Sequence, residues 1–390
     1  MDAVQNMIKT GDFINPQYNC QPRFEKPPLL YWLVVTSSYL FGLGEFSARL
    51  VSGLSAMGMV GITYLLTRDF FSKGKALSSA LVLATFPHLW LEARAVVPEM
   101  LNTFFALCGL YAFLKSRLVL GWFFLALAFL TKGPVGVVLA VGVYILWKRR
   151  LNFIKPIGLF IFLVVGFSWY AFMLLQHGYE YFYRFFIYEN LMRYTGQMST
   201  HPAPFYYYLP ILALSTLWYI PLYFRLIRSF RRDWLPLLLW AAFVLLFFSL
   251  ASNKLHHYIL FAYPPLAILL AEVVDKRYLK FSILISSFVF LLLMPLIHFY
   301  EKERFTPKAY PLVKNYEGPV YFYRAEDSAL VFYSGKCIKK LELPSSAEGL
   351  VITKEKNLEE LPFCRVLTKG REFDGVYLLL ECKRTEVKDP

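Results

Sequence analysis

The sequence has little charge and little cysteine. Only 17% of its 390 residues are Asp, Glu, Lys or Arg, against ~25% in typical soluble domains. Its five cysteines form no C-x-x-C pair, so neither a zinc knuckle nor a redox motif is indicated. A glycine-rich phosphate loop and an internal repeat are absent too. These absences argue against an ordinary soluble enzyme, a P-loop or dinucleotide-binding protein and a repeat protein.

Apolar residues are abundant instead: 57% of the chain is hydrophobic and 18% is aromatic. This composition indicates an integral membrane protein, in which a full span needs about 20 residues. Ten apolar segments can be drawn along the chain: 46–67, 76–91, 99–114, 118–131, 133–147, 157–175, 206–224, 234–251, 258–274 and 281–299.

Basic residues are concentrated in alternate loops. The net charge is +14, and five loops hold 16 Lys and Arg against three Asp. These loops are 68–75, 115–117, 148–156, 225–233 and 275–280. The positive-inside rule places them in the cytoplasm and accounts for nearly all of the excess charge. A nucleic-acid partner is therefore not needed to explain it.

This topology predicts an all-α polytopic membrane protein with a small C-terminal α/β domain. Residues 1–45 form a first outer loop with an interfacial or re-entrant helix over 28–43, residues 46–299 form the bundle, and residues 300–390 form the α/β domain outside the membrane. In that domain we expect a helix over 354–361 and five strands, over 320–324, 329–333, 349–353, 364–368 and 375–381. An outer N-terminus at Met1, without a signal peptide, leads us to expect a membrane helix upstream.

Three cysteines, Cys337, Cys364 and Cys382, lie in this outer tail, where one disulfide is feasible. Isolated small residues are the simpler interpretation of all five cysteines.

The outer loops carry the polar residues that suit a functional site. An acid and a base, Glu25 and Lys26, stand before two prolines at the start of an apolar run, and charges beside hydrocarbon are functional candidates by default. Further candidates come from the other outer loops: Glu92, Arg94, Glu99, Lys132, Glu189, Arg193, His201, Lys254, His256 and His257. We therefore expect the active face to be extracytoplasmic.

Several of these residues also have a purely structural interpretation. Glu99 follows Pro98, where a carboxylate is stabilised by the helix dipole, or it deprotonates an acceptor. Lys132 and Lys254 are snorkelling lysines or phosphate ligands. A single histidine such as His201 is usually not a metal ligand. Together with Glu25 and either His256 or His257 it would suit a metal site, although the spacing does not establish one. Cations and acids at a bilayer surface suit a substrate with a lipid tail and a phosphate head.

Six stretches carry a resemblance to a known family. They are Met7-Ile-Lys-Thr-Gly-Asp-Phe, Phe24-Glu-Lys-Pro-Pro-Leu-Leu-Tyr-Trp, Glu45-Phe-Ser-Ala-Arg-Leu, Phe129-Leu-Thr-Lys-Gly-Pro, Ala203-Pro-Phe-Tyr-Tyr-Tyr-Leu-Pro and Ser252-Asn-Lys-Leu-His-His-Tyr-Ile-Leu. Together they resemble the bacterial GT-C glycosyltransferases of the aminoarabinose transferase and protein O-mannosyltransferase type. The resemblance covers residues 1 to about 275 in the family's order.

The resemblance implies an inverting enzyme of the bacterial inner membrane that moves a sugar from a polyprenyl-phosphate carrier to a lipid A, glycan or protein acceptor. It implies that Lys26 and Arg193 hold the carrier phosphate, with Lys132 and Lys254 as further candidates. Glu25 and His201 match positions implicated in a divalent, zinc-like metal site, and Glu99 falls where the family has a second acidic residue.

One departure concerns the family's principal catalytic Asp, which lies upstream of the segment matching Ala3 to Ile8. We therefore expect either a longer native chain or a protein that relies on Glu99 or is inactive. The alternatives to an active transferase are a non-enzymatic lipid-carrier translocase and an inactive carrier-binding homologue. A translocase would place ionisable groups deep in several helices, whereas here they lie at one face.

Overall fold

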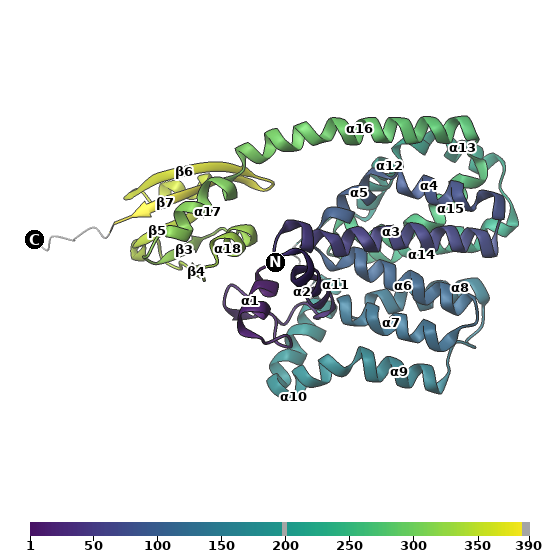
Figure 1. Ribbon diagram of the computed structural model, residues 1–390, viewed down its shortest axis with the longest axis horizontal. Coiled ribbons are helices and arrows are strands. Elements are labelled where there is room, and N and C mark those ends of the chain that lie inside the picture. The colour runs from purple at the N-terminus through teal and green to yellow at the C-terminus, as the bar shows by residue number, and fades with distance from the viewer. Residues whose placement is uncertain (197–200, 384–390) are drawn as a thin grey trace, which may run out of the picture. The chain divides into compact units, whose positions relative to one another are not determined.

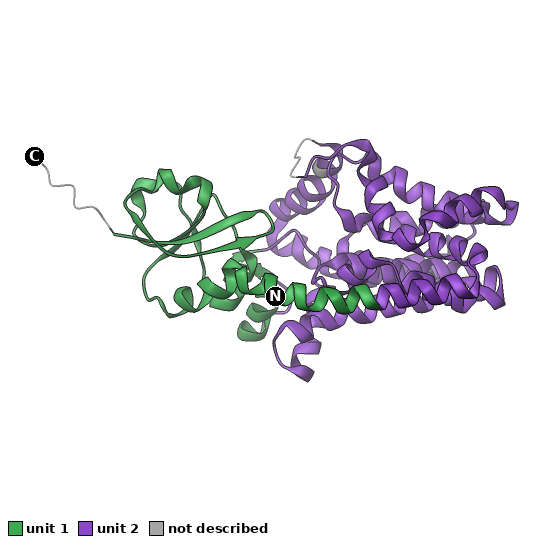
Figure 2. Cartoon of the chain, turned by 90° about the horizontal axis from the view of Figure 1, so that it is seen from above, with its two compact units in different colours: residues 1–11, 17–22, 288–390 green, residues 12–16, 23–287 purple. Residues whose placement is uncertain are grey.

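The computed structural model describes residues 1–196 and 201–383. The chain divides into two compact units, each assembled from separate stretches of sequence (Figure 2). The helical unit comprises residues 12–16 and 23–287, and the sheet unit comprises residues 1–11, 17–22 and 288–390. The predicted fold class, a helical bundle with a small α/β domain, is confirmed.

Each of the ten predicted apolar segments is helical in the structure (Figure 1). The helices are α2 (Leu29–Phe41), α3 (Glu45–Phe70), α4 (Ala76–Ala84), α5 (Pro87–Arg94), α6 (Pro98–Leu114), α7 (Leu118–Lys132), α8 (Val135–Lys148), α9 (Pro156–Gly166), α10 (Ser168–Phe182), α11 (Arg193–Thr195), α12 (Tyr208–Ser215), α13 (Ile220–Arg228), α14 (Leu235–Leu250), α15 (Tyr263–Val273) and α16 (Lys276–Glu303). A π-helix, η2 (Tyr183–Met192), follows α10, and a 3₁₀ segment, η6 (His256–Ala262), precedes α15. Shorter 3₁₀ turns are η1 (Lys73–Lys75), η3 (Phe205–Tyr207), η4 (Leu217–Tyr219) and η5 (Arg232–Trp234).

Not all of these helices are long enough to cross a membrane. By length and composition α3, Arg232–Leu250 and α16 qualify, and three bent pairs raise the number to six if each pair is one span. Those pairs, α4 with α5, α9 with α10 and α12 with α13, bend by 65°, 47° and 80°. The apolar helices α6, α7 and α8 have 17, 15 and 14 residues, at or below the lower limit of ~17 for a span. The expected interfacial helix corresponds to α2, with 13 residues.

Helix α6 is almost wholly enclosed by α3, α7 and α8. Its approach to α7 depends on two glycines. A Cβ on Gly121 would lie 2.2 Å from the Phe113 ring, and one on Gly109 would lie 2.6 Å from the Leu125 side chain. Small residues at such crossings are how apolar helices pack closely without a hydrophobic driving force from water. This packing fixes the first turn of α6, which carries Glu99.

The sheet unit contains a five-stranded sheet with the order β4-β3-β5-β7-β6. The strands are β3 (Val320–Tyr323), β4 (Lys339–Lys340), β5 (Gly349–Lys354), β6 (Cys364–Glu372) and β7 (Gly375–Cys382). β3 runs parallel to β4 and β5, whereas β7 pairs antiparallel with β5 and β6. The unit also contains α1 (Asp2–Thr10), the two-residue strands β1 (Gln17–Tyr18) and β2 (Gln21–Pro22), α17 (Phe305–Asn315), α18 (Ser328–Ser334) and the 3₁₀ segments η7 (Pro344–Ser346) and η8 (Glu355–Glu360).

The strand predicted over 329–333 is wrong, because these residues form α18. The Asp327 side chain accepts hydrogen bonds from the backbone N–H groups of Ala329 and Leu330, at 2.9 and 3.0 Å. An aspartate in this position is a strong helix N-cap. A five-residue apolar run fits a strand and a short helix equally well, and here the cap decides between them.

Four of the five cysteines form disulfides, which corrects their interpretation as isolated residues. Cys20 pairs with Cys337, and Cys364 pairs with Cys382. The second bond joins the paired ends of β6 and β7. Cys108, on α6, is a free and buried thiol.

Candidate functional site

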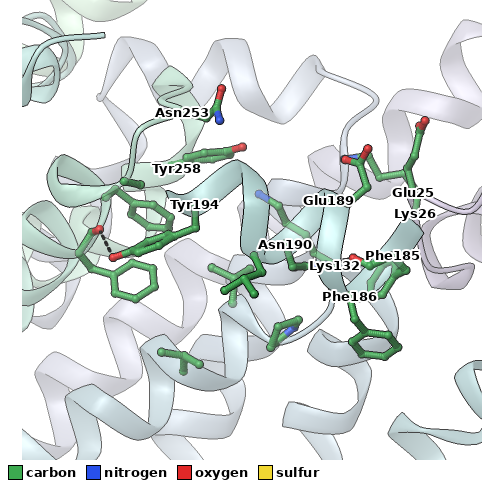
Figure 3. Close-up of a pocket in the computed structure, with 17 residues that line it drawn as sticks. Glu25, Lys26, Lys132, Phe185, Phe186, Glu189, Asn190, Tyr194, Asn253 and Tyr258 are labelled. Atoms are coloured by element: carbon green, nitrogen blue, oxygen red, sulfur yellow. Dashed lines mark hydrogen bonds between the residues drawn. The ribbon is translucent and has the colours of Figure 1, made fainter. Parts of the chain in front are cut away.

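A cavity of about 620 Å³ opens in the helical unit (Figure 3). Much of its wall is apolar, with Val135, Val138, Phe185, Phe186, Phe247 and Phe248 among the lining side chains. Among the described residues, four charged side chains also line it: Glu25, Lys26, Lys132 and Glu189. An apolar pocket of a few hundred Å³ with a few polar groups is the usual form of a small-molecule site. The mixture suits a ligand with one ionic and one apolar end.

Lys132 enters this cavity from the turn between two helices. It is the last residue of α7, and Gly133 follows with φ +85°, a backbone conformation that favours glycine. The Gly133 N–H donates to the Phe129 carbonyl, and Pro134 then starts the turn into α8. A lysine at a helix C-terminus is stabilised by the helix dipole. The Leu-Thr-Lys-Gly-Pro sequence therefore fixes the place of this ammonium group.

The Lys132 ammonium is held by a buried carboxylate. Its Nζ lies 3.0 Å from Glu99 Oε1 and 4.2 Å from the centre of the Tyr258 ring. His257 Nε2 lies 3.2 Å from the same Glu99 oxygen, and the Lys26 charge acts on this carboxylate as well. Among the described residues that line the cavity, Lys132 and Tyr258 are present and Glu99 is not. Glu99 therefore contacts Lys132 but does not itself line the cavity.

Glu25 and Lys26, which are adjacent in the chain, both line the cavity. Glu25 is half-buried and ion-paired with Arg23 at 3.6 Å and with Arg184 at 3.8 Å. Two guanidinium groups beside this carboxylate disfavour a metal ion there. Figure 3 shows Glu25, Lys26 and Glu189 toward one side of the view and Asn253 toward the other.

Lys254 and His201 are used within the loops that carry them. Lys254 Nζ donates to the Ala203 and Ala251 carbonyls at 3.0 and 2.5 Å, its side chain is buried, and burial lowers its pKa. The exposed His201 receives a backbone contact on each side: its N–H donates to Asn253 Oδ1 and its carbonyl accepts from the Lys254 N–H. These bonds join residues 201–203 to residues 251–254.

The predicted phosphate ligand Arg193 begins α11, and its side chain lies outside the described part of the structure. The sequence reasoning missed His88, because this residue falls inside the apolar segment 76–91. Its one signal is Glu92 four residues later, which puts both side chains on one helix face. Among the described residues, the three-residue group with metal-ligand spacing is His88, Glu92 and His256, and it contains neither Glu25 nor His201.

Comparison with known proteins places this site in a family. Residues 25–174 match the profile of the dolichyl-phosphate-mannose-protein mannosyltransferase family. An uncharacterised protein of Aquifex aeolicus is 46% identical over 380 residues, which cover 97% of this chain and 91% of that protein. The undecaprenyl phosphate-alpha-4-amino-4-deoxy-L-arabinose arabinosyl transferase of Shewanella sediminis is 32% identical over 292 residues, which cover 70% of this chain and 54% of that protein. The chain thus spans about half the length of such curated transferases.

A solved structure agrees with these sequence relationships. The crystal structure of ArnT from Cupriavidus metallidurans bound to undecaprenyl phosphate matches with a TM-score of 0.77 and 20% sequence identity, over 97% of this chain and 92% of that one. The ArnT fold and the apolar helices identify a multi-pass membrane protein. The resemblance inferred from the sequence motifs is confirmed: the chain belongs to the GT-C family of aminoarabinose transferases and protein mannosyltransferases.

Proposed function

We propose that this protein transfers a sugar from a polyprenyl-phosphate carrier to an acceptor at the extracytoplasmic face of the bacterial inner membrane. The observation that carries the proposal is the cavity, because it combines two lysines with an aromatic and aliphatic wall. The names of the relatives support it, since they are arabinosyl transferases that use undecaprenyl phosphate.

The two ends of the carrier would meet different parts of the cavity. Lys26 and Lys132 would bind the phosphate as point charges, and Arg193 is proposed to add a third cation. The polyprenyl chain would lie along Val135, Val138 and the Phe185–Phe186 pair. Removing this apolar surface from water stabilises binding by roughly 25 cal/mol per Å².

In the proposed reaction an acceptor oxygen attacks the anomeric carbon of the sugar, and the bond from that carbon to the phosphate oxygen breaks. The electron pair stays on the polyprenyl phosphate, where the lysines stabilise the added charge. A carboxylate takes the acceptor proton. Glu99 is the residue predicted for this step from the sequence, whereas Glu25 and Glu189 are carboxylates that line the cavity. We propose that Glu99 acts by positioning Lys132, and that a lining carboxylate takes the proton.

A transfer assay with the purified full chain and undecaprenyl-phosphate-linked sugars tests the function. Lys26→Ala and Lys132→Met should each lower transfer by about 100-fold or more, the usual loss when one transition-state electrostatic contact is removed. Lys73→Ala is the matched control, because Lys73 is exposed in η1. Equal transfer by the wild type and the two cavity variants would contradict the phosphate site.

The same assay separates the roles of the carboxylates. If Glu99 positions Lys132, Glu99→Gln with Lys132→Met should lose no more activity than Lys132→Met alone. A proton acceptor, by contrast, should show its loss in kcat with undecaprenyl phosphate binding unchanged. We expect this second behaviour for Glu189→Gln or Glu25→Gln. The acceptor itself, a lipid, a glycan or a protein, would be identified by the labelled product.

A further inference from the structure

A second group of polar side chains lies in the helical unit, close to the ion pair of Glu99 and Lys132. His88 and Glu92 are one turn apart on α5, and His256 starts η6. His88 Nε2 lies 3.3 Å from Glu92 Oε1, and His256 Nδ1 lies 2.9 Å from His88 Nε2 and 3.0 Å from Glu92 Oε1. His88 and Glu92 are 8% and 2% exposed, whereas His256 is open to solvent. Three ligand-type atoms therefore converge at the end of a buried helix face.

Neighbouring hydroxyls fix which nitrogen of His88 carries a proton. The Ser215 hydroxyl donates to the Ile211 carbonyl at 2.6 Å, so it accepts from the Tyr263 hydroxyl at 2.7 Å. The Tyr263 oxygen must then accept from His88 Nδ1, 2.5 Å away. In neutral His88 the proton is thus on Nδ1, and the lone pair of Nε2 faces Glu92 Oε1 and His256. Metal-binding histidines are usually oriented by such a bond from the other ring nitrogen.

The carboxylate of this group lacks a full set of partners. Glu92 Oε2 is buried and has no hydrogen-bond partner among the described residues, and the nearest imidazole nitrogen, His257 Nδ1, is 3.9 Å away. A buried carboxylate oxygen left in this way destabilises the fold, because its lost contact with water is not replaced. A cation bound at Oε1, between Glu92 and the two histidines, would offset the negative charge of this buried and incompletely hydrogen-bonded carboxylate.

We propose that His88 Nε2, Glu92 Oε1 and His256 Nδ1 bind one divalent transition-metal ion, with zinc as the best match. Bonds of ~2.0–2.1 Å in a tetrahedral site put ligand atoms roughly 3.3 Å apart, and the three separations are 2.9, 3.0 and 3.3 Å. Two imidazoles and one carboxylate are a zinc-type donor set. The exposed side of His256 leaves the fourth position to water.

Such an ion would connect the cluster to the cavity. It would tie α5 to η6, two elements that are 168 residues apart at the His88–His256 contact. His257 follows His256 directly and contacts Glu99, which in turn holds Lys132. The ion would therefore fix the segment that supports the lysine, and its role is to position that segment.

Metal analysis of the purified full chain tests the proposal directly. Zinc should copurify with, or after chelation rebind to, the wild type at about one ion per chain. His256→Asn and Glu92→Gln should lower zinc affinity by at least about tenfold. Tyr263→Phe, which removes the bonds to His88 and Ser215 but no ligand atom, should also weaken it by ~10–100-fold. His298→Asn is the control, since His298 is exposed on α16. Cobalt substitution should give a tetrahedral visible spectrum in the wild type and lose it in His256→Asn.

His256 is exposed, so its replacement does not threaten the fold, and a loss of zinc there reports on the site itself. A wild type that takes up no zinc would overturn the proposal, as would a His256→Asn variant that binds zinc as tightly as the wild type. Loss of zinc in Glu25→Gln or His201→Asn, with zinc retained in His256→Asn, would assign the metal to the site implied by the sequence resemblance instead. None of these outcomes depends on sugar transfer.

Discussion

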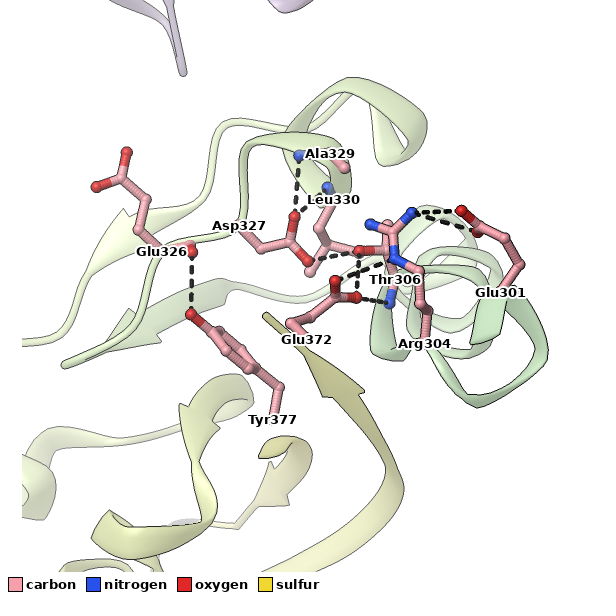
Figure 4. A network of polar contacts seen from close by, with 9 residues as sticks. All are labelled: Glu301, Arg304, Thr306, Glu326, Asp327, Ala329, Leu330, Glu372 and Tyr377. Carbon is pink, nitrogen blue, oxygen red and sulfur yellow. Dashed lines mark hydrogen bonds and ion pairs between the residues drawn. The ribbon is translucent and has the colours of Figure 1, made fainter. Parts of the chain in front are cut away.

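Each unit contains a group of charged side chains, part-buried in the sheet unit and with buried carboxylates in the helical unit, and the two groups differ in how completely their carboxylates are hydrogen-bonded. In the sheet unit Glu372 Oε1 accepts from the Thr306 N–H and hydroxyl at 3.1 and 3.2 Å, and Oε2 accepts from Arg304 Nε at 3.0 Å (Figure 4). Asp327 Oδ2 shares the proton of the same hydroxyl, at the shorter distance of 2.7 Å, and Asp327 Oδ1 caps α18. In this network both oxygens of each of the two carboxylates have a partner.

In the helical unit the corresponding carboxylates are incomplete. Lys132 and His257 both contact Glu99 Oε1, while Oε2 of Glu99 and Oε2 of Glu92 are buried without hydrogen-bond partners among the described residues. In a closed network like that of Glu372 every carboxylate oxygen already has a protein partner, which is what a structural role requires. Buried carboxylate oxygens without hydrogen-bond partners lower the stability of the fold. They are expected where a substrate or an ion binds nearby.

The largest effect that would sharpen this comparison is expected for Lys132→Met. It leaves the buried Glu99 charge with His257 as its direct contact and the charge of Lys26 further away, so the free energy of unfolding should fall by about 3–5 kcal/mol, the usual loss when one partner of a buried ion pair is removed. Adding Glu99→Gln removes the stranded charge and should restore part of that stability without restoring transfer. Thermal unfolding in detergent measures the stability of each variant, and the transfer assay measures its activity. A double variant no more stable than Lys132→Met would show that the buried Glu99 charge is not the cause of the loss.

A smaller effect is expected from opening the closed network. Glu372→Gln replaces a charged acceptor of three hydrogen bonds with a neutral amide, which should lower the stability of the sheet unit by about 1.5–3 kcal/mol. Transfer and carrier binding should stay at the wild-type level, because the network has a structural role. The rate of proteolysis of the sheet unit tests the loss of stability, and the transfer assay tests the unchanged activity. A loss of transfer at wild-type stability would show that this network is functional as well.

The smallest effect concerns an exposed pair of the sheet unit. The Lys354 ammonium donates to Asp374 and lowers the pKa of that carboxyl below 3.8. A lowered carboxyl pKa adds stability above the unfolded value and loses it as the pH falls through the folded value. Below pH ~4 the sheet unit should therefore lose at most about 1 kcal/mol, since solvent screens this exposed pair. Asp374→Asn should abolish that part of the pH dependence of the unfolding free energy. An unchanged pH dependence in the variant would show that the Lys354–Asp374 pair does not contribute to stability.

The sequence was sufficient for the parts of the fold that depend on local pattern. All ten apolar stretches are helical, although three of them are bent pairs of shorter helices that the hydrophobic pattern did not reveal. The family motifs could be recognised because each is contiguous in the chain. The sequence was insufficient where two distant segments meet. His88 looked like part of an apolar run, and only the fold shows that His256 contacts it.

The site residues divide along the same line. Lys26 and Lys132 were predicted from their neighbours in the chain, and both line the cavity. Lys254 has an equally basic setting in sequence, yet its ammonium is taken up by two carbonyls. Backbone acceptors leave no trace in a sequence, because every residue has one. The sequence pattern therefore could not separate a lysine in the wall from a lysine that joins two loops.

The bond between Cys20 and Cys337 also constrains how the chain is threaded through a bilayer. The two residues are 317 positions apart and covalently joined, so they must be on the same side of the membrane. The chain between them therefore crosses an even number of times. The ten crossings expected from the sequence meet this condition, as do the six reached among the described residues when each bent pair is one span, whereas an odd number would not. Because disulfides persist in oxidising compartments, a single thiol-labelling experiment on intact cells, with and without reductant, would read out the parity and the sidedness of the protein together.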